Sequence, residues 1–598
     1  MKSLMLLAEG VLADASAWCR TSTTLDFNTI QRRVDHEGLS FLTITLSDFC
    51  KDFERSLDQG SVDPTMFASF SKHKALPRFL GGLLDLVFDR STGRLLAHPD
   101  ANAIYFIRQI TLMYKKISLP CSEKRRRKAF ADYVKCENEV RSWNDNISED
   151  VLHRFQSVSS SIWGEDLSLV DRKIYEISHI PKHGPGATAD KISGNRKFNI
   201  REWTTRLEDY FPSAEFVVPN FGFVDELNTV DFIEPEAEIP VRVITVPKTL
   251  KTPRIIAIEP LCMQYAQQSL LEIIVESLEK SKLLQGSIGF TLQEPNQFLA
   301  KKGSIDGKLA TIDLSEASDR VSNLLVKRML HNFPTLSGAV QACRSLRADV
   351  PGEGIHTLSK FASMGSALCF PIEAMVFLTI IAISESDRLK RQLRRKDLSD
   401  LFSRVRVYGD DIIVPVDLVP YVTHNLVLYG LKVNERKSFW TGKFRESCGK
   451  DYYDGEDVSV TYLRRKFPSS RSDASEMIST VAFRNLLYKA GLWNTVRYLD
   501  SVIERLAPFP NVAETSPVLG RNSVLGYTEE RICEKLHRPL VKGLIVRVKH
   551  RKSFLDGPGA LLKFFLKRGP EPLFDVKHLE RHGRPESVDI KIGWSYSY

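Results

Sequence analysis

Two adjacent aspartates between two apolar strands are the feature that most constrains this chain. Residues 405–414 read Val-Arg-Val-Tyr-Gly-Asp-Asp-Ile-Ile-Val. The alternating apolar residues around the Gly-Asp pair predict a β-hairpin that carries Asp410 and Asp411 at its tip. Adjacent carboxylates repel each other unless a cation or a proton relieves the repulsion. Magnesium is the simplest cation that fits, although Gly-Asp is also typical of an ordinary hairpin turn.

A second acidic segment supports a metal site. Residues 309–312 predict a short buried strand that ends at Asp313, and a helical pattern follows. If this strand pairs beside the hairpin, Asp313 joins Asp410 and Asp411, and two charges about 4 Å apart repel by about 4 kcal/mol at an effective dielectric of about 20. Such oxygen ligands suit two Mg²⁺ ions, with Mn²⁺ as a substitute. Taken alone, Asp313 is better explained as a strand-end or helix-capping acid.

Further segments surround these acids in a definite order. They are the basic segment 246–260, the acidic segment 313–319, the small-residue loop 363–366, the hairpin at 408–411, and the segments 429–437 and 444–449. In this order they resemble motifs F, A, B, C and D of RNA-dependent RNA polymerases and a signature beyond motif C. The resemblance is specifically to the replicase subunit beta of levivirus-type single-stranded RNA bacteriophages, and it runs from about residue 182 to about residue 462.

The resemblance implies an α+β fold of the right-hand polymerase type, with an antiparallel palm sheet flanked by helices. Residues 1–300 are expected to form the fingers, including motif F at 241–260. Residues 301–465 are expected to form the palm with motifs A to E, and residues 466–598 the thumb and C-terminal tail. A chain of 598 residues with 43% hydrophobic residues can bury a core of this size.

The resemblance also implies roles for single side chains. Asp313, Asp410 and Asp411 are expected to bind the metal ions, and Lys437 is expected to protonate the leaving pyrophosphate. The motif F cations would hold the incoming triphosphate, and residues of motifs A and B would read the ribose and the template. These substrate-binding residues are Lys248, Lys251, Arg254, Asp319, Ser363, Gly365 and Ser366. Glu373 departs from the asparagine that many relatives carry on the motif B helix, so the ribose-reading network stays open.

The expected activity is RNA-directed RNA polymerisation. The enzyme would copy a viral single-stranded RNA genome from ribonucleoside triphosphates by two-metal nucleotidyl transfer, without a primer. The implied partners are template and product RNA, host elongation factors Tu and Ts, and a small-subunit ribosomal protein. The expected location is the cytoplasm of the infected bacterium.

Two other classes of protein share some of these features. A reverse transcriptase has the same acidic palm, but its sugar gate is a bulky aromatic residue, whereas this motif A offers Glu316 and Asp319. A non-enzymatic RNA-binding protein would explain the net charge of +9 and the basic run at 124–128. It would not explain three converging aspartates.

The cysteines and the apolar runs bear on whether the chain has a zinc site, a disulfide framework or a membrane-spanning helix. The nine cysteines are scattered and include no Cys-x-x-Cys pair, which argues against a zinc site and a disulfide framework. The strongest apolar run, residues 367–383, contains Pro371 and Glu373 and is shorter than a membrane span. We therefore expect a buried helix behind motif B and no membrane partner.

Overall fold

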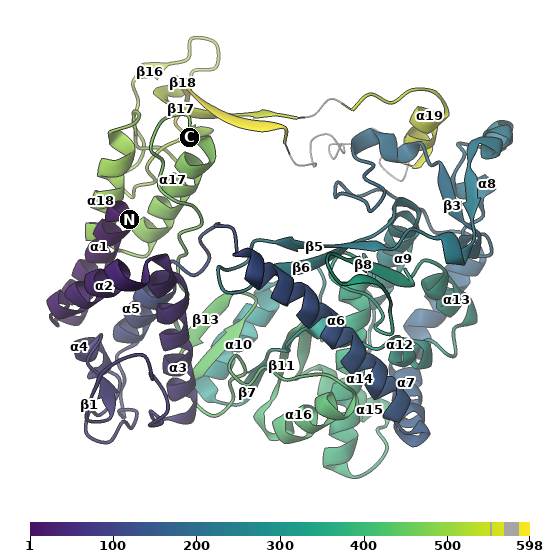
Figure 1. Ribbon diagram of the computed structural model, residues 1–598, viewed down its shortest axis with the longest axis horizontal. Coiled ribbons are helices and arrows are strands. Elements are labelled where there is room, and N and C mark those ends of the chain that lie inside the picture. The colour runs from purple at the N-terminus through teal and green to yellow at the C-terminus, as the bar shows by residue number, and fades with distance from the viewer. Residues whose placement is uncertain (551–552, 567–584) are drawn as a thin grey trace.

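A three-stranded antiparallel sheet lies in the lower half of the computed structural model (Figure 1), which describes residues 1–550, 553–566 and 585–598. Its strand order is β10–β11–β7, with the bounds Arg406–Tyr408, Asp411–Pro415 and Leu309–Ile312. Tyr408 pairs with Asp411, and Ile412 pairs with Ile312. The predicted hairpin and the strand beside it are confirmed, and Gly409 and Asp410 form the hairpin turn.

Helices pack on this sheet. Helix α14 (Cys369–Leu389) contacts β10, α7 (Glu149–Tyr175) and α16 (Val419–Leu428), while α10 (Glu294–Asp306) packs on β7 and β11. Every residue of α14 from position 371 to position 385 is buried. Among the described residues, α14 is the single helix long and apolar enough to cross a membrane, and 89% of its most apolar stretch is buried inside the protein. The expected buried helix is confirmed.

A second sheet carries the motif F segment. Its strand order is β6–β5–β8–β9, with the bounds Arg254–Ile258, Val241–Val246, Arg347–Val350 and Gly354–Thr357. Helix α6 (Glu123–Asn146) crosses beside this sheet (Figure 1), and its residues Phe130 and Tyr133 share a core with β5 and β8. The chain reverses between β5 and β6 in the loop 247–253. Motif F is thus a hairpin, whose strands satisfy each other's backbone hydrogen bonds.

The N-terminal region packs with helices that are distant in sequence. Core residues from Leu4 to Ile117 belong to α1 (Lys2–Cys19), α3 (Leu46–Gln59), α5 (Ala101–Leu112) and their connections. They share one hydrophobic core with residues of α17 (Ala474–Lys489) and α18 (Trp493–Glu504). The sequence analysis placed residues 1–300 in the fingers, whereas in the structure residues 4–117 of that range pack against residues of the predicted thumb and against residues 439–463 of the predicted palm. An apolar helix face is visible in a sequence, but the distant helix that covers it is not.

Asp14 joins the N-terminal helix to α18. Its buried carboxylate accepts hydrogen bonds from the backbone N–H groups of Asn494 (2.8 Å) and Thr495 (2.9 Å) and from the Thr495 hydroxyl (2.6 Å). We expect Asp14→Ala to lower the free energy of unfolding by about 2 kcal/mol, because the start of α18 loses its cap. Chemical denaturation measures this loss, with Asp35→Ala at an exposed position of α2 (Thr24–Glu37) as the control. Equal stability of the two variants would contradict the capping role.

In the C-terminal part, β17 (Pro539–Lys549) pairs antiparallel with β18 (Ser587–Tyr596), within a sheet that also contains β15 (Val518–Leu519) and β16 (Arg531–Ile532). In Figure 1 the β17–β18 pair extends from the side of α17 and α18 toward the opposite side of the molecule. There α19 (Gly557–Leu566) packs against η2 (Gly194–Phe198). The predicted thumb and tail include residues 551–552 and 567–584, which lie outside the described residues.

Candidate active site

Three aspartates meet at one end of the central sheet. Asp313 directly follows β7, Asp410 lies in the hairpin turn, and Asp411 is the first residue of β11. Because Ile312 pairs with Ile412 in antiparallel strands, the next positions place Asp313 beside Asp411. A Cβ at Gly409, where φ is +58°, would lie 2.3 Å from the Phe370 ring, so the turn requires glycine. The fold thus brings the three predicted acids together.

Burial and mutual repulsion favour the protonated forms of two of these acids. Burial raises the pKa of Asp411 to about 7, and the charges of Asp410, Glu446 and Asp313 act in the same direction. Burial also raises the pKa of Asp313 to about 6, with Lys437 opposing and Glu446 and Asp410 adding to the shift. A bound cation would relieve the repulsion that contributes to these shifts. The cluster therefore has the electrostatics of a cation site.

The motif D segment lies directly against Asp313. The Asn434 side chain donates to Asp313 Oδ2 at 2.7 Å, and the Asn434 N–H donates to the Asp313 carbonyl at 2.9 Å. The Lys437 ammonium lies 3.8 Å from Asp313 Oδ1. The Glu446 carboxylate raises the pKa of Lys437 above its ordinary value, and the three aspartates act in the same direction. Lys437 is therefore protonated at neutral pH.

The donor chemistry of the acid cluster suits Mg²⁺, because carboxylate oxygens are ligands that this ion prefers. Within the described ranges, no group of three or more His, Cys, Asp or Glu side chains is arranged to hold a metal ion as the side chains lie. The oxygens of Asp313 instead contact Asn434 and Lys437. The donors fit the ion, but in this arrangement an amide and an ammonium group partner those of Asp313.

The three motif F cations have different surroundings. Burial and the charges of Arg254 and Lys437 lower the pKa of Lys248, whereas Asp313 and Asp410 oppose that shift. Lys248 therefore lies within electrostatic reach of the acid cluster, and Arg254 lies near Lys248. Lys251 is turned away, since its ammonium pairs with Asp48 of α3 at 2.9 Å. Because the chain reverses between β5 and β6, the three cations do not lie in one row along a single extended segment.

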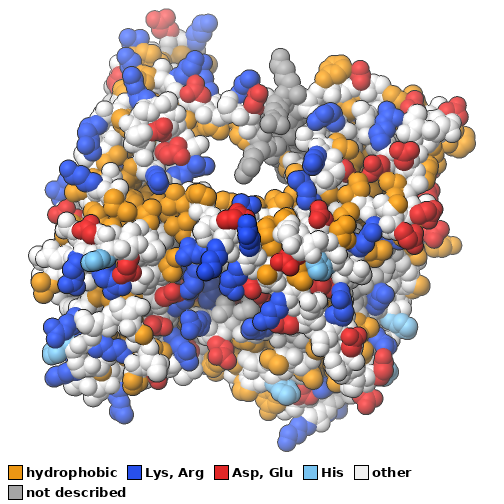
Figure 2. Space-filling model, in the orientation of Figure 1, with side chains coloured by type: hydrophobic (Ala, Val, Ile, Leu, Met, Phe, Trp, Pro, Cys, Tyr) orange, Lys and Arg blue, Asp and Glu red, His pale blue; other side chains and the backbone are white. Residues whose placement is uncertain are grey.

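The basic start of α6 lies beside the motif F loop. The Arg125 side chain donates to the Leu250 carbonyl at 2.7 Å, and residues 124 and 126–128 of the same run are exposed. Figure 2 shows Lys and Arg side chains gathered at the middle of this face, near the start of α6. The basic surface therefore continues from the motif F loop onto the first turns of α6.

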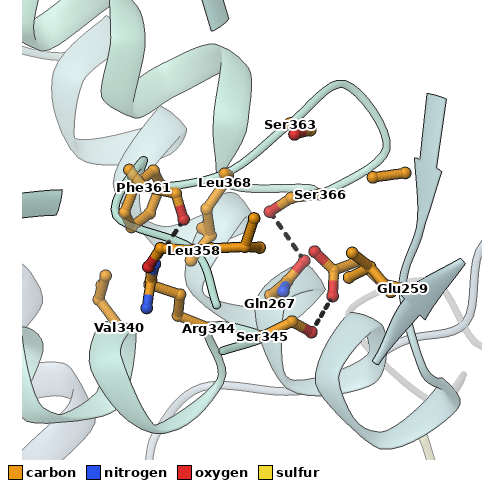
Figure 3. A pocket seen from close by; sticks show the side chains of 13 residues that line it. Glu259, Gln267, Val340, Arg344, Ser345, Leu358, Phe361, Ser363, Ser366 and Leu368 are labelled. Carbon is orange, nitrogen blue, oxygen red and sulfur yellow. Dashed lines mark hydrogen bonds between the residues drawn. The ribbon is translucent and has the colours of Figure 1, made fainter. Parts of the chain in front are cut away.

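The motif B loop is held from behind by β6 and α9 (Leu261–Glu279). A Cβ at Gly365, where φ is +133°, would lie 1.9 Å from the carbonyl oxygen of Ala257, so only glycine fits. Gln267 Oε1 accepts hydrogen bonds from the Ser366 hydroxyl at 3.1 Å and from the next backbone N–H at 3.0 Å (Figure 3). These contacts fix the loop against the motif F strand.

Two buried ionisable groups lie below the motif B loop. Ser345 donates a hydrogen bond to Glu259 (Figure 3), and burial raises the pKa of Glu259 to about 7. The Arg344 guanidinium donates at 2.6 to 2.9 Å to three backbone carbonyls, those of Leu358, Lys360 and Phe361. One buried arginine thus holds the main chain that leads into motif B.

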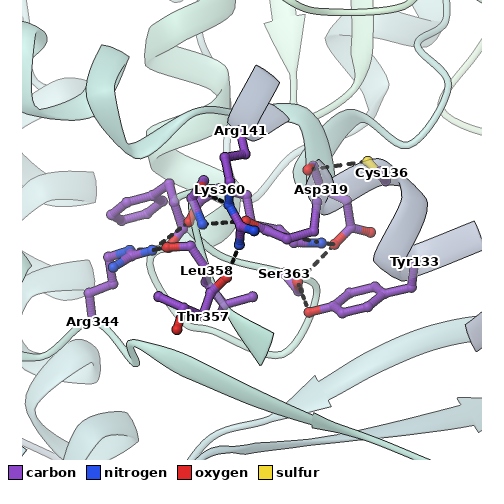
Figure 4. Close-up of polar contacts among 12 residues, drawn as sticks. Tyr133, Cys136, Arg141, Asp319, Arg344, Thr357, Leu358, Lys360 and Ser363 are labelled. Carbon is purple, nitrogen blue, oxygen red and sulfur yellow. Dashed lines mark hydrogen bonds and ion pairs between the residues drawn. The ribbon is translucent and has the colours of Figure 1, made fainter. Parts of the chain in front are cut away.

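Asp319 and Ser366, the nearest candidates that the resemblance implies for reading the ribose, contact different side chains. Asp319 Oδ1 accepts a hydrogen bond from Ser363 at 2.7 Å (Figure 4), whereas Ser366 binds Gln267. Asp319 therefore pairs with the first serine of motif B. Glu373, which departs from the family pattern, is buried and accepts a hydrogen bond from Ser318 at 2.7 Å. Burial raises the pKa of Glu373 to about 8, which favours a neutral carboxyl group at this position.

Sequence reasoning missed several side chains that support these motifs, namely Gln267, Arg344, Lys360, Asn434 and Glu446. Asn434 and Glu446 lie in the segments 429–437 and 444–449, to which the resemblance draws attention without assigning roles to these two side chains. The local patterns around Gln267 and Arg344 show no sign of a site. Lys360 has a local signal, because it stands between Leu358 and the apolar pair 361–362. A lysine inside a short apolar stretch is a signal for a buried, paired charge.

Comparisons with known proteins find relatives for part of the chain. Residues 228–479 match the family described as RNA replicase, beta-chain. The chain is 38% identical over 228 residues to the RNA-directed RNA polymerase subunit beta of Qbeta virus strain MX1, which covers 38% of this chain and 36% of that protein. It is 38% identical over 225 residues to the RNA-directed RNA polymerase beta chain of Escherichia phage MS2, which covers 37% of each. The RNA-directed RNA polymerase subunit beta of Enterobacteria phage SP is 30% identical over 350 residues, 56% of each protein.

The matched regions span between about a third and about half of these curated relatives. Among solved structures, the BmCPV RNA-dependent RNA polymerase at elongation state has a TM-score of 0.36 and 10% identity, and the match covers 60% of this chain and 34% of that one. A score this low does not establish a shared fold. On the sequence matches, at 30–38% identity over 37–56% of its length, the chain is similar to levivirus-type RNA replicase beta chains.

Proposed function

We propose that the chain is an RNA-directed RNA polymerase that copies a viral single-stranded RNA genome from ribonucleoside triphosphates and starts without a primer. The observation that carries the proposal is the meeting of Asp313, Asp410 and Asp411 at one end of an antiparallel sheet, with Lys248 within electrostatic reach. Carboxylates that bind cations, together with a lysine that binds phosphate, are what nucleotidyl transfer needs. The family match at residues 228–479 supports the same activity.

Asp313 and Asp410 are the proposed ligands of two Mg²⁺ ions, with Asp411 in support and Mn²⁺ as a substitute. When bound, the ions would activate the RNA 3′-hydroxyl and stabilise the departing pyrophosphate. The contribution of the chain itself is positioning, because strand pairing fixes the main chain of Asp411 and Asn434 orients the Asp313 carboxylate.

Lys248 and Arg254 are the proposed ligands of the incoming triphosphate. Lysine supplies a mobile point charge, and the planar fork of arginine suits two phosphate oxygens at once. Lys251 would join them only after leaving Asp48, with which it forms an exposed ion pair that contributes little stability. Reading of the ribose and the template is proposed for Asp319, Ser363, Gly365 and Ser366.

Lys437 is the proposed general acid. It is protonated at neutral pH and lies 3.8 Å from Asp313 Oδ1. We expect Lys437→Met to lower the maximal rate of single-nucleotide addition by about a hundredfold, because the leaving pyrophosphate loses its proton donor. Rapid-quench kinetics on a fixed template measure this rate, with the exposed Lys432→Met on the same segment as the control. A normal maximal rate with weaker nucleotide binding would instead assign Lys437 to binding alone.

The wider assignment follows the family resemblance. We propose a right-hand arrangement with a palm at 301–465 and a thumb in the C-terminal part, where the N-terminal helices pack. The proposed partners are template and product RNA, host elongation factors Tu and Ts, and a small-subunit ribosomal protein. The proposed location is the cytoplasm of the infected bacterium.

The experiment that tests the function is RNA synthesis by the full-length chain on a single-stranded RNA template, first alone and then with bacterial elongation factors Tu and Ts. We expect RNA product in the presence of Mg²⁺ and none after chelation. Product formed from deoxynucleotides in preference to ribonucleotides would support a reverse transcriptase. RNA binding without any polymer, even with the factors, would overturn the polymerase assignment.

A further inference from the structure

Lys360 is a fully buried cation at the entrance to motif B. Its ammonium lies 3.0 Å from Asp319 Oδ1 and 3.9 Å from Glu137 Oε2 of helix α6, and its side chain is 0% exposed. Burial alone would lower the pKa of Lys360, but the Asp319 charge raises it above its ordinary value. A buried lysine is stable only when carboxylates compensate its charge. Lys360 and these two carboxylates therefore form one electrostatic unit.

Tyr133 of α6 contacts the same unit in two ways. Its ring lies 3.6 Å from the Lys360 ammonium, which is a cation–π contact, and its hydroxyl lies 3.0 Å from Ser363 Oγ. Ser363 has a single hydroxyl proton and gives it to Asp319 Oδ1 at 2.7 Å. Tyr133 must then be the donor to Ser363. Figure 4 shows the resulting chain, which runs from Tyr133 through Ser363 to Asp319.

Both donors approach the same oxygen of Asp319. The ammonium of Lys360 and the hydroxyl of Ser363 each bind Oδ1. No hydrogen bond reaches Oδ2 from any residue in the described ranges, and the Asp319 side chain is 22% exposed. Side chains of the protein thus hold Oδ1 of Asp319, whereas Oδ2 can accept a further hydrogen bond.

We propose that Lys360 and Tyr133 are positioning residues that hold Asp319 so that its Oδ2 accepts a hydrogen bond from a ribose hydroxyl of the incoming nucleotide. The inference rests on the proposed polymerase function and names the residues that set its preference for ribonucleotides. Discrimination then depends partly on α6, a helix of the N-terminal region that carries none of the polymerase motifs. A site built to bond a hydroxyl rejects the analogue that lacks it, because the buried polar group is left unpaired.

The main chain around Lys360 is held independently of its side chain. Arg344 binds the carbonyls of residues 358, 360 and 361, and Arg141 of α6 donates to the Thr357 carbonyl at 2.9 Å. Removing the ammonium group should therefore release the Asp319 carboxylate without displacing the backbone. This separation makes a side-chain substitution at residue 360 an informative test.

The test measures the ratio of kcat/KM for CTP to that for dCTP with the full-length chain on one RNA template. We expect the ratio to fall by about tenfold in Lys360→Met and by a smaller factor in Tyr133→Phe, since each loses a contact that orients Asp319. The matched control is Lys197→Met, another lysine with no exposed surface, whose ammonium binds backbone carbonyls at Gly184 and Gly186. The control is expected to lower the melting temperature and leave the ratio unchanged.

Each outcome decides between defined alternatives. An unchanged ratio in Lys360→Met and Tyr133→Phe, with wild-type RNA synthesis intact, would overturn the positioning role alone. A wild-type chain that makes no RNA would overturn the proposed function itself. If Lys360→Met does not fold, Tyr133→Phe decides the question, because that change removes one hydroxyl and keeps the ring over Lys360. A ratio that falls equally in Lys197→Met would show a general effect of instability and overturn the proposal.

Discussion

Replacing Asp410 by asparagine is expected to lower RNA synthesis by about a thousandfold while the fold stays intact. Asp410 lies in a two-residue turn, and the change from carboxylate to amide alters its charge but hardly its shape. The acid cluster then loses a charge that favours a bound cation, and a neutral amide oxygen is a weaker ligand. The rate of nucleotide incorporation at saturating Mg²⁺ and nucleotide measures the loss.

Asp417→Asn is the matched control for this change. Asp417 lies in η6 (Val416–Leu418), is exposed, and approaches Arg388 no closer than 3.8 Å, so its charge contributes little. We expect wild-type synthesis from this variant and matching thermal unfolding curves for both variants. Equal rates for wild type and Asp410→Asn would remove Asp410 from the reaction.

A single methyl group at residue 365 is expected to have the second large effect. The added Cβ would lie 1.9 Å from the carbonyl oxygen of Ala257, and the φ of +133° is one that side chains rarely allow. Because the obstacle is the backbone of β6, either the motif B loop or the motif F hairpin must move. We expect Gly365→Ala to lower the free energy of unfolding by about 3 kcal/mol and to abolish RNA synthesis. Chemical denaturation and the incorporation assay measure the two effects.

Gly352→Ala separates the cost of backbone conformation from that of the contact with β6. Gly352 also has a positive φ, +83°, but nothing lies within 4 Å of the position of its Cβ. We expect this control to lose only about 1 kcal/mol. Equal losses in the two variants would show that conformation, rather than the closeness of β6, requires glycine at residue 365.

The parts of the site that can be predicted from the sequence are those that a short, continuous segment specifies. A run of alternating apolar residues around Gly409 and Asp410 specifies a hairpin, and residues 309–312 specify a buried strand. The pairing of this strand with the hairpin, which brings Asp313 close to Asp411, is a condition of the sequence argument and is found in the structure. The buried helix α14 can be predicted for the same reason, because one continuous apolar run specifies it. The same reasoning predicts a glycine loop at motif B without showing that Gly365 presses on β6.

The rest depends on contacts between segments that are distant in sequence. Lys251 looks like a phosphate ligand in the chain, yet α3 supplies Asp48 as its partner. The contact of Tyr133 with Ser363 spans 230 residues, and no periodicity in either segment indicates it. The N-terminal helices are visible as amphipathic patterns, but their packing on α17 and α18 is decided by the shapes of faces that only the folded chain brings together.

The hydrophobic core that residues 4–117 share with residues 439–499 has a consequence for synthesis of the chain on the ribosome. Residues 4–117 emerge first, but part of their apolar surface is covered only when residues 439–499 arrive. Roughly 320 residues separate the two parts, which at roughly 5–20 residues per second corresponds to roughly 15–60 s of translation. During that interval the nascent N-terminal helices expose surface that other chains or chaperones can bind. The yield of folded protein should therefore depend on elongation speed between these two segments.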